Sequence, residues 1–293
     1  MISFIIVNYN TKVITEECIN SILNNKLIDS LFEVIVVDND STDDSPNYLK
    51  KVFNKYKNVK IIKNSQNIGF GNANNIGFQE SKGDFLIFLN SDTLVSDTNF
   101  NDLLKQFTLE ENIGFLSSLV LNSNNTIQSI GYDRPGLKTD FKINALYWNF
   151  NFMKSIRLSK YRKVGLRKVG WVSGCFMICN KYDFLKLEGF DPNIFMYAED
   201  LDICLRMEKI GKNNYVYDET SIYHLHGKSN NNNNLLRKLY KQKKNYFYVL
   251  EKNNFGNISA IKIMTIYHIL SLTFIKKIVT ILRIFKRKEG EKI

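Results

Sequence analysis

The chain has 293 residues, of which 44% are hydrophobic, and 40 Lys and Arg against 29 Asp and Glu give it a formal net charge of +11. This hydrophobic content excludes a disordered chain and suits one medium-sized catalytic domain with an appendage. The positive charge indicates attraction to polyanions such as nucleic acid, anionic lipid or phosphorylated substrates, and by itself does not choose among them.

The first ten residues, MISFIIVNYN, lack the charged segment and the small-residue cleavage site of a secretory signal. The cysteines follow no metal-ligand spacing; they are Cys18, Cys175, Cys179 and Cys204. Free cysteines of this kind are typical of a reducing compartment. We therefore expect buried free thiols and a cytoplasmic protein.

The first hundred or so residues alternate short β-branched runs with helical patterns. This alternation is typical of an α/β fold with a mostly parallel sheet flanked by helices. The expected strands are 3–7, 33–37, 59–62 and 85–89, and the expected helices are 16–23, 46–56 and 72–80. Because ligands bind outside the carboxyl ends of the strands in such sheets, the polar residues that follow each strand are expected to line one crevice.

The second half of the chain is less regular. An apolar run at 113–121 is expected to continue the sheet, and the stretch 122–168 has the composition of a loop and lid. An ordered block at 169–229 contains an expected strand at 172–178 and an expected helix at 200–210.

A polar run of asparagines around 230–234 marks a domain boundary. We expect a catalytic domain over residues 1–230 and a basic, amphipathic, helical tail over residues 231–293. The uncharged run 263–275 is too short to span a membrane, which takes about 20 apolar residues. The tail either lies in the headgroup region of an anionic membrane or packs on the catalytic domain, and its pattern fits both.

The polar residues after the second and fourth strands are candidates for ligand contacts. Asp38 ends the second strand, where its carboxylate can accept hydrogen bonds from a pyrimidine base or a ribose, whereas Ser41, Asp43 and Ser45 are expected to cap the next helix. The fourth strand ends in Phe88-Leu-Asn-Ser-Asp-Thr, which places an amide and a carboxylate on the same side of an extended chain. Such a pair suits a hard divalent cation that also holds a diphosphate, although it is also a common turn sequence.

A glycine-containing loop precedes the third helix. From Gly69 onward it fails the Rossmann fingerprint, because Asn74 occupies the sixth position, where that pattern needs glycine. What remains is a loop of small residues that leads into a helix, whose free N–H groups can meet a nucleotide.

Three carboxylates lie at the start of the helix expected at 200–210, namely Glu199, Asp200 and Asp202. Acidic residues at a helix N-terminus are favourable for dipole reasons alone, at roughly 0.3 to 1 kcal/mol each. The preceding Phe195-Met-Tyr run would in addition set a carboxylate in a restricted pocket.

A short segment near residue 224 holds two of the three histidines. Alternate residues of a strand face one side, so His224 and His226 could meet one metal, although a lone histidine is more often structural. Lys228, close by, could meet a phosphate.

Taken in order, six segments between residues 2 and 229 resemble family 2 glycosyltransferases, and within that family the rhamnosyltransferase-like branch. They are Val7-Asn-Tyr-Asn, Asp38-Asn-Asp-Ser-Thr-Asp, Asn67-Ile-Gly-Phe-Gly with Ala73-Asn-Asn, Leu89-Asn-Ser-Asp-Thr, Val172-Ser-Gly-Cys-Phe-Met-Ile and Phe195-Met-Tyr-Ala-Glu-Asp-Leu-Asp. The resemblance implies a GT-A fold, which is Rossmann-like, here with a C-terminal helical extension, and Mn²⁺ or Mg²⁺ as the cofactor.

The resemblance also implies roles for single residues. Asp200 would be the general base, and Glu199 and Asp202 would support it or the acceptor site. Asp92 would be a metal ligand, and His224, which fits the family's His-x-x-Gly-x-Ser pattern, would contact the metal or the diphosphate. Asn90 stands where many relatives carry the first Asp of an Asp-x-Asp motif. The residues expected to bind the donor nucleotide are Asn8, Tyr9, Asp38, Asn67, Gly69, Asn74, Asn75, Asn90 and Lys228.

Together these features predict an inverting glycosyltransferase that is peripheral on the inner face of the cell membrane and holds the anionic surface through its tail. Its donor would be dTDP-rhamnose or, second, a UDP-hexose, its acceptor a cell-surface polysaccharide or a polyprenyl-diphosphate-linked glycan, and nucleic acid is not an expected partner.

Two alternatives stay open. A nucleotidyltransferase of related architecture would show a Gly-rich basic loop after the first strand, which Asn8-Tyr-Asn-Thr-Lys does not offer. A catalytically silent glycan-binding protein is disfavoured because Asp92, Asp200 and His224 are all present.

Overall fold

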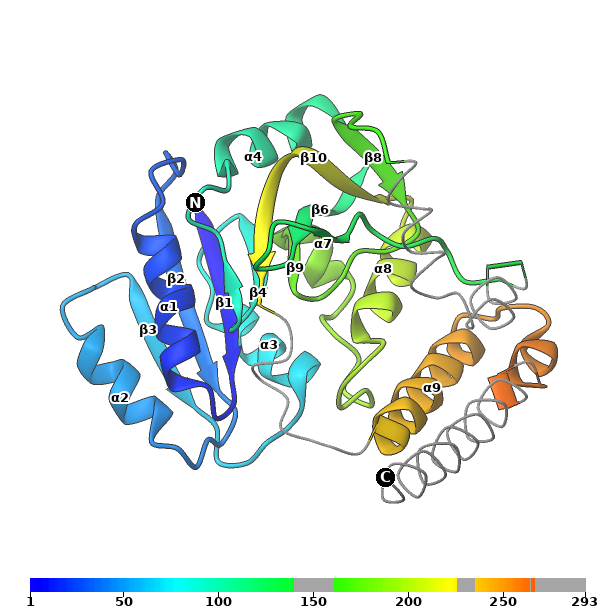
Figure 1. The fold of residues 1–293 in the computed structure, drawn as a ribbon, viewed down its shortest axis with the longest axis horizontal. Coiled ribbons are helices and arrows are strands. Elements are labelled where there is room, and N and C mark those ends of the chain that lie inside the picture. The colour runs from blue at the N-terminus through cyan, green and yellow to red at the C-terminus, as the bar shows by residue number, and fades with distance from the viewer. Residues whose placement is uncertain (137, 140–160, 226–234, 264, 267–293) are drawn as a thin grey trace, which may run out of the picture. The chain divides into compact units, whose positions relative to one another are not determined.

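The computed structural model describes residues 1–136, 138–139, 161–225, 235–263, 265 and 266, with the backbone alone at 235–239 (Figure 1). The chain divides into two compact units. The first comprises Met1–Arg134 and Arg162–Val249, and the second comprises Pro135–Tyr161 and Leu250–Ile293. The predicted boundary after residue 230 falls in 226–234, outside the described residues.

The first unit is built on a mixed, mostly parallel sheet with the strand order β3-β2-β1-β4-β9-β6-β10-β5, while β7 pairs with β6 and β8 with β10. The strands are β1 (Ile2–Asn8), β2 (Phe32–Asp38), β3 (Val59–Lys63), β4 (Phe85–Asn90), β5 (Thr93–Leu94), β6 (Ile113–Leu121), β7 (Ile127–Ser129), β8 (Leu166–Val169), β9 (Phe176–Asn180) and β10 (Asn213–His224). β1 pairs in parallel with β2 and β4, β2 with β3, and β6 with β10. β9 runs in the opposite direction between β4 and β6.

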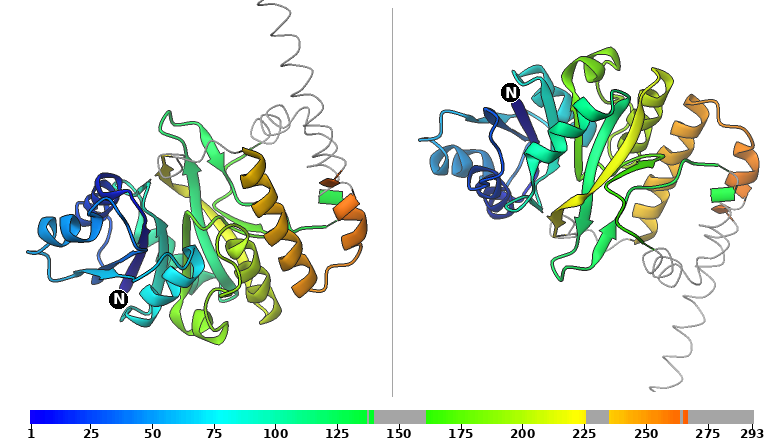
Figure 2. Two further views of the ribbon diagram at one scale, coloured as in Figure 1. Left: turned by 90° about the horizontal axis from the view of Figure 1, so that it is seen from below. Right: turned by 90° about the horizontal axis from the view of Figure 1, so that it is seen from above.

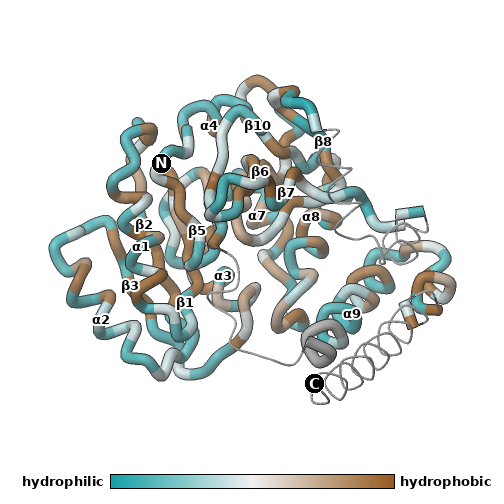
Figure 3. Tube along the Cα trace, in the orientation of Figure 1, coloured by the Kyte–Doolittle hydropathy of each residue, from teal (hydrophilic) through white to brown (hydrophobic). Residues whose placement is uncertain are grey.

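Helices cover both faces of this sheet (Figures 1 and 2). They are α1 (Lys12–Leu23), α2 (Ser45–Val52), α3 (Phe70–Gln79), α4 (Phe100–Leu109), α7 (Lys181–Lys186) and α8 (Glu199–Lys209). A further helix, α9 (Leu235–Lys252), follows later in the chain. Because alternate residues of a strand face opposite sides, β1 directs Phe4 and Ile6 toward α1, α2 and α4, and Ile5 toward α7 and α8. Strands buried on both faces are mostly apolar, as the hydrophobic stretches of the strands in Figure 3 show.

The expected helices and strands of the first hundred residues are all present, with ends that differ by a few residues. The expected strand at 172–178 begins later, at Phe176, because residues 174–175 form a turn. The prediction of a loop at 122–168 was wrong in part: Ile127–Ser129 and Leu166–Val169 are strands that pair with β6 and β10. The flanked, mostly parallel α/β architecture and the C-terminal helix are confirmed.

The four cysteines are buried and free, as predicted. Burial raises the pKa of the Cys175 thiol to about 12. Among the described residues, no helix is long and apolar enough to cross a membrane.

Candidate active site

Parallel pairing brings the ends of three strands together at one edge of the sheet. In the register of the sheet, Asn8 at the end of β1 lies opposite Asp38 at the end of β2, and Val7 lies opposite Asn90 at the end of β4. Residues 30 and 83 positions apart in sequence therefore meet, as the strand-end argument predicted.

Asp38 is fully buried and held in a fixed orientation. Its Oδ2 accepts a hydrogen bond from Asn8 Nδ2 at 2.5 Å, and its Oδ1 accepts one from the Ser41 backbone N–H at 3.0 Å. Asn8 Oδ1 in turn accepts hydrogen bonds from the hydroxyls of Thr11 and Thr15. Asn8 therefore orients the carboxylate of Asp38, while the neighbouring Tyr9 is 45% exposed.

The glycine loop packs against the segment that precedes α8. Gly69 has a φ of +86°, and a Cβ there would lie 2.1 Å from the carbonyl oxygen of Phe195, so only glycine fits. The Phe70 N–H donates to that same oxygen at 2.9 Å. Asn67 Oδ1 accepts hydrogen bonds from the Gly69 N–H and from Asn39 Nδ2, which fixes the shape of the loop.

The asparagines of α3 differ in what they contact. Asn75 makes two hydrogen bonds with the backbone of Phe190, donating from Nδ2 at 2.9 Å and accepting at Oδ1 at 2.8 Å. Asn74 donates to the Phe70 carbonyl at 3.0 Å, and its buried Oδ1 has no hydrogen-bond partner among the described residues. Asn75 therefore fastens the segment before α8, whereas Asn74 keeps an acceptor atom that these residues do not use.

Asp92 and His224 meet at the end of β4. His224 Nε2 lies 3.1 Å from Asp92 Oδ1 and 3.3 Å from Asn90 Nδ2, and the Gln128 carboxamide contacts His224 Nδ1. The pairing of β10 with β5, which places His224 opposite Thr93, makes this meeting possible. Gln128 was not predicted; because it contacts the second ring nitrogen, it orients the imidazole.

Asp92, His224 and Asn90 carry side-chain groups that can serve as ligands of a divalent cation. A carboxylate, an imidazole and a carboxamide are all ligands that Mn²⁺ accepts. Within the described residues, no group of three or more His, Cys, Asp or Glu side chains could hold a metal ion. A cation at Asp92 would therefore need further oxygen ligands from a bound substrate, as Mg²⁺ commonly does with phosphates.

Asp200 lies in the first turn of α8 and is partly buried. Its Oδ2 accepts a hydrogen bond from the Gly174 N–H at 3.0 Å, and its Oδ1 accepts one from the Leu201 N–H at 2.8 Å. Burial raises the pKa of Asp200, although these two hydrogen bonds oppose the rise. Burial, with a smaller contribution from Asp200, raises the pKa of the adjacent Glu199 to about 8, and Glu199 Oε2 is buried without a hydrogen-bond partner.

One turn of backbone links the two carboxylates Asp200 and Asp92. The Gly174 N–H binds Asp200, and the next residue, Cys175, accepts hydrogen bonds at its carbonyl from the Asn90 N–H at 3.1 Å and the Thr93 hydroxyl at 3.4 Å. Asn90 and Thr93 flank Asp92, and adjacent Cα atoms are only about 3.8 Å apart. Both carboxylates also act to raise the pKa of the Cys175 thiol, which places each of them near it.

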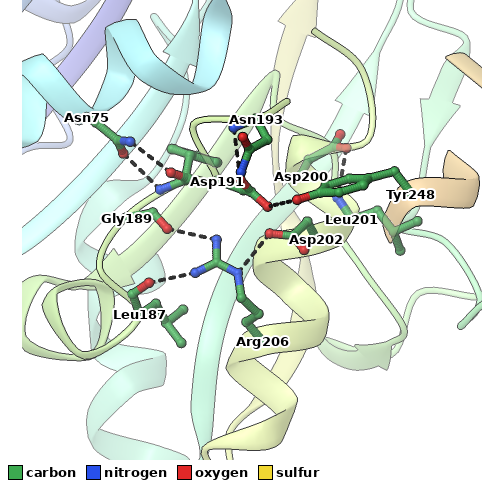
Figure 4. Close-up of polar contacts among 11 residues, drawn as sticks. Asn75, Leu187, Gly189, Asp191, Asn193, Asp200, Leu201, Asp202, Arg206 and Tyr248 are labelled. Carbon is green, nitrogen blue, oxygen red and sulfur yellow. Dashed lines mark hydrogen bonds and ion pairs between the residues drawn. The ribbon is translucent and has the colours of Figure 1, made fainter. Parts of the chain in front are cut away.

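Asp202 is fully buried and pairs with Arg206 rather than facing Asp200 (Figure 4). Arg206 Nε donates to Asp202 Oδ2 at 2.8 Å, while its Nη1 and Nη2 donate to the carbonyls of Leu187 and Gly189 at 2.6 and 2.7 Å. The pair therefore ties α8 to the segment that follows α7. The predicted Lys228, and His226 with it, lie outside the described residues.

Comparison with known proteins gives a family model and several relatives. The model Glycosyl transferase family 2 matches residues 3–182. The chain is similar to rhamnosyltransferase WbbL of Escherichia coli K12, with 26% identity over 270 residues that cover 86% of this chain and 96% of that protein. It is also 26% identical over 191 residues to the N-acetylglucosaminyl-diphospho-decaprenol L-rhamnosyltransferase of Mycobacterium tuberculosis H37Rv, covering 61% of each chain.

Solved structures show the same fold. The mannosyltransferase PcManGT from Pyrobaculum calidifontis, solved with GDP-Man and Mn²⁺, matches with a TM-score of 0.60 and 15% identity over 86% of this chain and 63% of that one. GalNAc-T7, solved with UDP, GalNAc and Mn²⁺, matches with a TM-score of 0.63 and 18% identity over 92% of this chain and 55% of that one. These likenesses confirm the predicted GT-A fold. This chain spans less than two thirds of the length of either solved chain.

Proposed function

Since the chain belongs to glycosyl transferase family 2 and is therefore a glycosyltransferase, we propose that it is an inverting, metal-dependent enzyme. In this proposal it transfers a sugar from a nucleoside diphosphate to a hydroxyl of a polysaccharide or a polyprenyl-diphosphate-linked glycan. The donor proposed first is dTDP-rhamnose, because two relatives of this chain are named as rhamnosyltransferases. A UDP-hexose is the second candidate.

The observation that carries the proposal is the turn at Gly174 and Cys175. It joins Asp200 to the strand end that bears Asn90 and Asp92 through two consecutive peptide groups. Direct displacement at a sugar carbon needs a proton acceptor and a site for the leaving diphosphate within the reach of one donor molecule. The turn provides that proximity.

In this proposal, the nucleotide-sugar donor binds at the ends of β1 and β2 and at the glycine loop. The buried carboxylate of Asp38 accepts N–H or O–H groups of the base or the ribose, and Asn8 fixes its orientation. Tyr9, which is exposed, lines the same pocket. The loop of Asn67 and Gly69 contributes to the nucleotide site, together with the unused acceptor of Asn74 and with Asn75, which holds the adjoining segment.

Asp92, His224 and Asn90 would hold the cation, which would offset the negative charge that develops on the leaving diphosphate. The carboxylate, imidazole and carboxamide groups of these side chains suit such an ion as ligands. Lys228 would contact the same diphosphate. The chain's own contribution is to keep Asp92 and His224 within 3.1 Å of each other before the donor arrives.

Asp200 removes the proton from the acceptor hydroxyl. A bond forms between that oxygen and the anomeric carbon while the bond from this carbon to the diphosphate oxygen breaks on the opposite face, so the anomeric configuration inverts. Both carboxylate oxygens of Asp200 accept a backbone N–H, which aims the carboxylate and leaves further lone pairs for the proton. Because burial raises the pKa of Asp200, the group is a stronger base than an exposed aspartate.

The two neighbouring carboxyl groups support Asp200. Glu199, with a pKa raised to about 8, holds its proton at neutral pH and so adds no second charge beside Asp200. Asp202 acts through Arg206, which fixes the segment that leads to the base.

The tail after α9 is proposed to bind the anionic inner face of the cell membrane, where a polyprenyl-linked acceptor would lie. The relative that acts on a decaprenol-linked sugar supports this placement. In a sedimentation assay with anionic vesicles, the full chain should bind, and a Lys276→Glu, Lys277→Glu variant should bind less. Equal sedimentation of the two would contradict the tail's role.

A screen of nucleotide sugars in Mn²⁺ tests the proposed function. A donor that binds only the folded state raises its melting temperature, and we expect dTDP-rhamnose to give the largest rise. The product made from that donor with a hydroxyl acceptor should carry the inverted anomeric configuration by NMR. A retained configuration would exclude Asp200 as the base of a single displacement.

A further inference from the structure

The segment between α7 and α8, residues 187–198, delivers Asp200 to the site. It contains four residues with positive φ, which are Glu188 at +57°, Gly189 at +78°, Tyr197 at +73° and Ala198 at +69°. Non-glycine residues in this region cost of order 1–3 kcal/mol each, so such a conformation persists only where surrounding contacts hold it. The last two of them directly precede Glu199 and Asp200.

The first half of this segment is held from α3 and α8. Asn75 binds both backbone groups of Phe190, Asn72 donates to the Pro192 carbonyl at 3.1 Å, and Arg206 donates to the carbonyls that flank Glu188. Beyond Pro192, the Phe70 N–H at the start of α3 donates to the Phe195 carbonyl at 2.9 Å.

The segment is also held from α9, and Figure 4 shows the contact of its Tyr248 with Asp191. Tyr248 donates its hydroxyl to Asp191 Oδ2 at 3.0 Å, and Asn245 Nδ2 donates to the Met196 carbonyl at 2.8 Å. Asn245 and Tyr248 are three residues apart, so they lie on one face of the helix. Their two acceptors bracket the stretch from Asp191 to Met196.

Both hydrogen-bond acceptors, the Asp191 carboxylate and the Met196 carbonyl, lie where they help to determine the backbone conformation of the segment. Asp191 Oδ1 accepts hydrogen bonds from Asn193 N at 2.9 Å and Asn193 Nδ2 at 3.0 Å, so its carboxylate organises a tight turn. The Met196 carbonyl precedes the first strained residue, Tyr197. Ile194 is fully buried, but the side chains of Phe195 and Met196 are 47% and 38% exposed, so apolar burial holds the end of the stretch next to Tyr197 only weakly.

We propose that α9 is a positioning element of the catalytic centre, in which Asn245 and Tyr248 hold the 191–196 stretch so that Asp200 points at the acceptor hydroxyl. This inference rests on the proposed function of Asp200 as the base. Neither residue contacts Asp200; each acts through the backbone that carries it. A shift of the base by about 1 Å can cost about a hundredfold in rate, so loss of these contacts lowers turnover without removing the donor site.

The test uses the full chain with Tyr248→Phe, Asn245→Ala and the double variant. The matched control is Tyr240→Phe, which removes a hydroxyl from a tyrosine of the same helix that is 67% exposed. For each protein, kcat at saturating substrates, the Kd of dTDP or UDP in Mn²⁺ and the melting temperature are measured. Binding stoichiometry of the nucleotide gives the folded fraction by which kcat is corrected.

We expect kcat to fall about tenfold in each single variant and about a hundredfold in the double variant, with the nucleotide Kd within about twofold of wild type. The control should match wild type. Asn245→Gln, which keeps a donor group on a longer arm, should retain more activity than Asn245→Ala. It also serves as the second variant if Asn245→Ala does not fold.

Corrected kcat values that stay at the wild-type level in Tyr248→Phe and Asn245→Ala, or that fall equally in the Tyr240→Phe control, would overturn the inference. Asp200→Asn is measured in the same series. If it is inactive while the α9 variants are normal, only the role of α9 fails. If Asp200→Asn turns over normally, the proposed base fails, and the positioning role fails with it.

Discussion

Replacing Glu199 by Gln should make the folded protein more stable at neutral pH, with an effect that disappears in mild acid. Glu199 is buried, its Oε2 has no hydrogen-bond partner, and burial raises its pKa from the ordinary 4.5 to about 8. In the unfolded chain the group ionises near 4.5, so the unfolded state releases a proton that the folded state keeps. The contribution of Glu199 to the free energy of unfolding is therefore fully present below pH 4.5 and is lost as the pH rises toward 8.

The size of the effect follows from the two pKa values. A rise from 4.5 to about 8 corresponds to roughly 5 kcal/mol once the pH exceeds both values, and to roughly 3 kcal/mol at pH 7. Between pH 5 and pH 7 the wild-type chain should lose roughly 2 to 3 kcal/mol through this residue alone. Glutamine has nearly the same shape and stays neutral, so the variant should lack this dependence.

The assay is urea unfolding of both proteins at pH 5, 6, 7 and 8, followed by tryptophan fluorescence. The free-energy difference between Glu199→Gln and wild type should grow with pH over this range. An exposed glutamate of α1, changed in Glu17→Gln, provides the control and should give a flat difference. If the curves of Glu199→Gln and wild type run parallel from pH 5 to 8, Glu199 does not keep its proton in the folded protein.

Three further predictions concern backbone fit, the buried ion pair and the base. Gly69→Ala should destabilise the chain by several kcal/mol in urea unfolding, because its Cβ would lie 2.1 Å from a backbone carbonyl oxygen. Gly211 also has a positive φ but lies in open space, so Gly211→Ala should cost only about 1 kcal/mol. Equal costs for the two variants would contradict the clash. Arg206→Met should cost about 3–5 kcal/mol by removing the cation from the buried Asp202 carboxylate, and adding Asp202→Asn should recover part of this cost. No recovery would show that the charge pair is not the cause. Because burial raises the pKa of Asp200, kcat should fall on the acid side with an apparent pKa above 3.8, and a rate independent of pH down to 4 would argue against this base.

The first part of the fold could be predicted from sequence because its strands are continuous apolar runs. β1, β2 and β4 are buried on both faces, so their residues are mostly apolar whichever way they point. Apart from its end at His224, β10 was not predicted as a strand, because the residues it buries include Asn214 and Asp218. Asn214 donates to two backbone carbonyls and Asp218 accepts from the N–H groups of Val164 and Gly165, so these polar side chains are paired inside. A pattern of apolar alternation cannot show such a strand.

The candidate site also contains some residues that could be predicted from the sequence and others that could not. Sequence motifs indicated Asp92 and His224, and the structure brings them within 3.1 Å of each other. The residues that orient them and the base come from elsewhere in the chain: Gln128 is 96 residues from His224, and Tyr248 is 57 residues from Asp191. No local spacing connects such pairs, because only the folded chain brings them together.

The central claim is that a base at Asp200 and a cation site at Asp92 serve one donor molecule. The most direct measurement is calorimetric titration of dTDP and UDP, with and without Mn²⁺, into Asp200→Asn and Asp92→Ala, together with the transfer rate of each variant. The account predicts that Asp200→Asn binds nucleotide as wild type does and loses about a hundred- to ten-thousandfold in transfer, while Asp92→Ala loses the part of nucleotide binding that depends on Mn²⁺. Normal transfer by Asp200→Asn, or Mn²⁺-dependent binding that survives in Asp92→Ala, would contradict it.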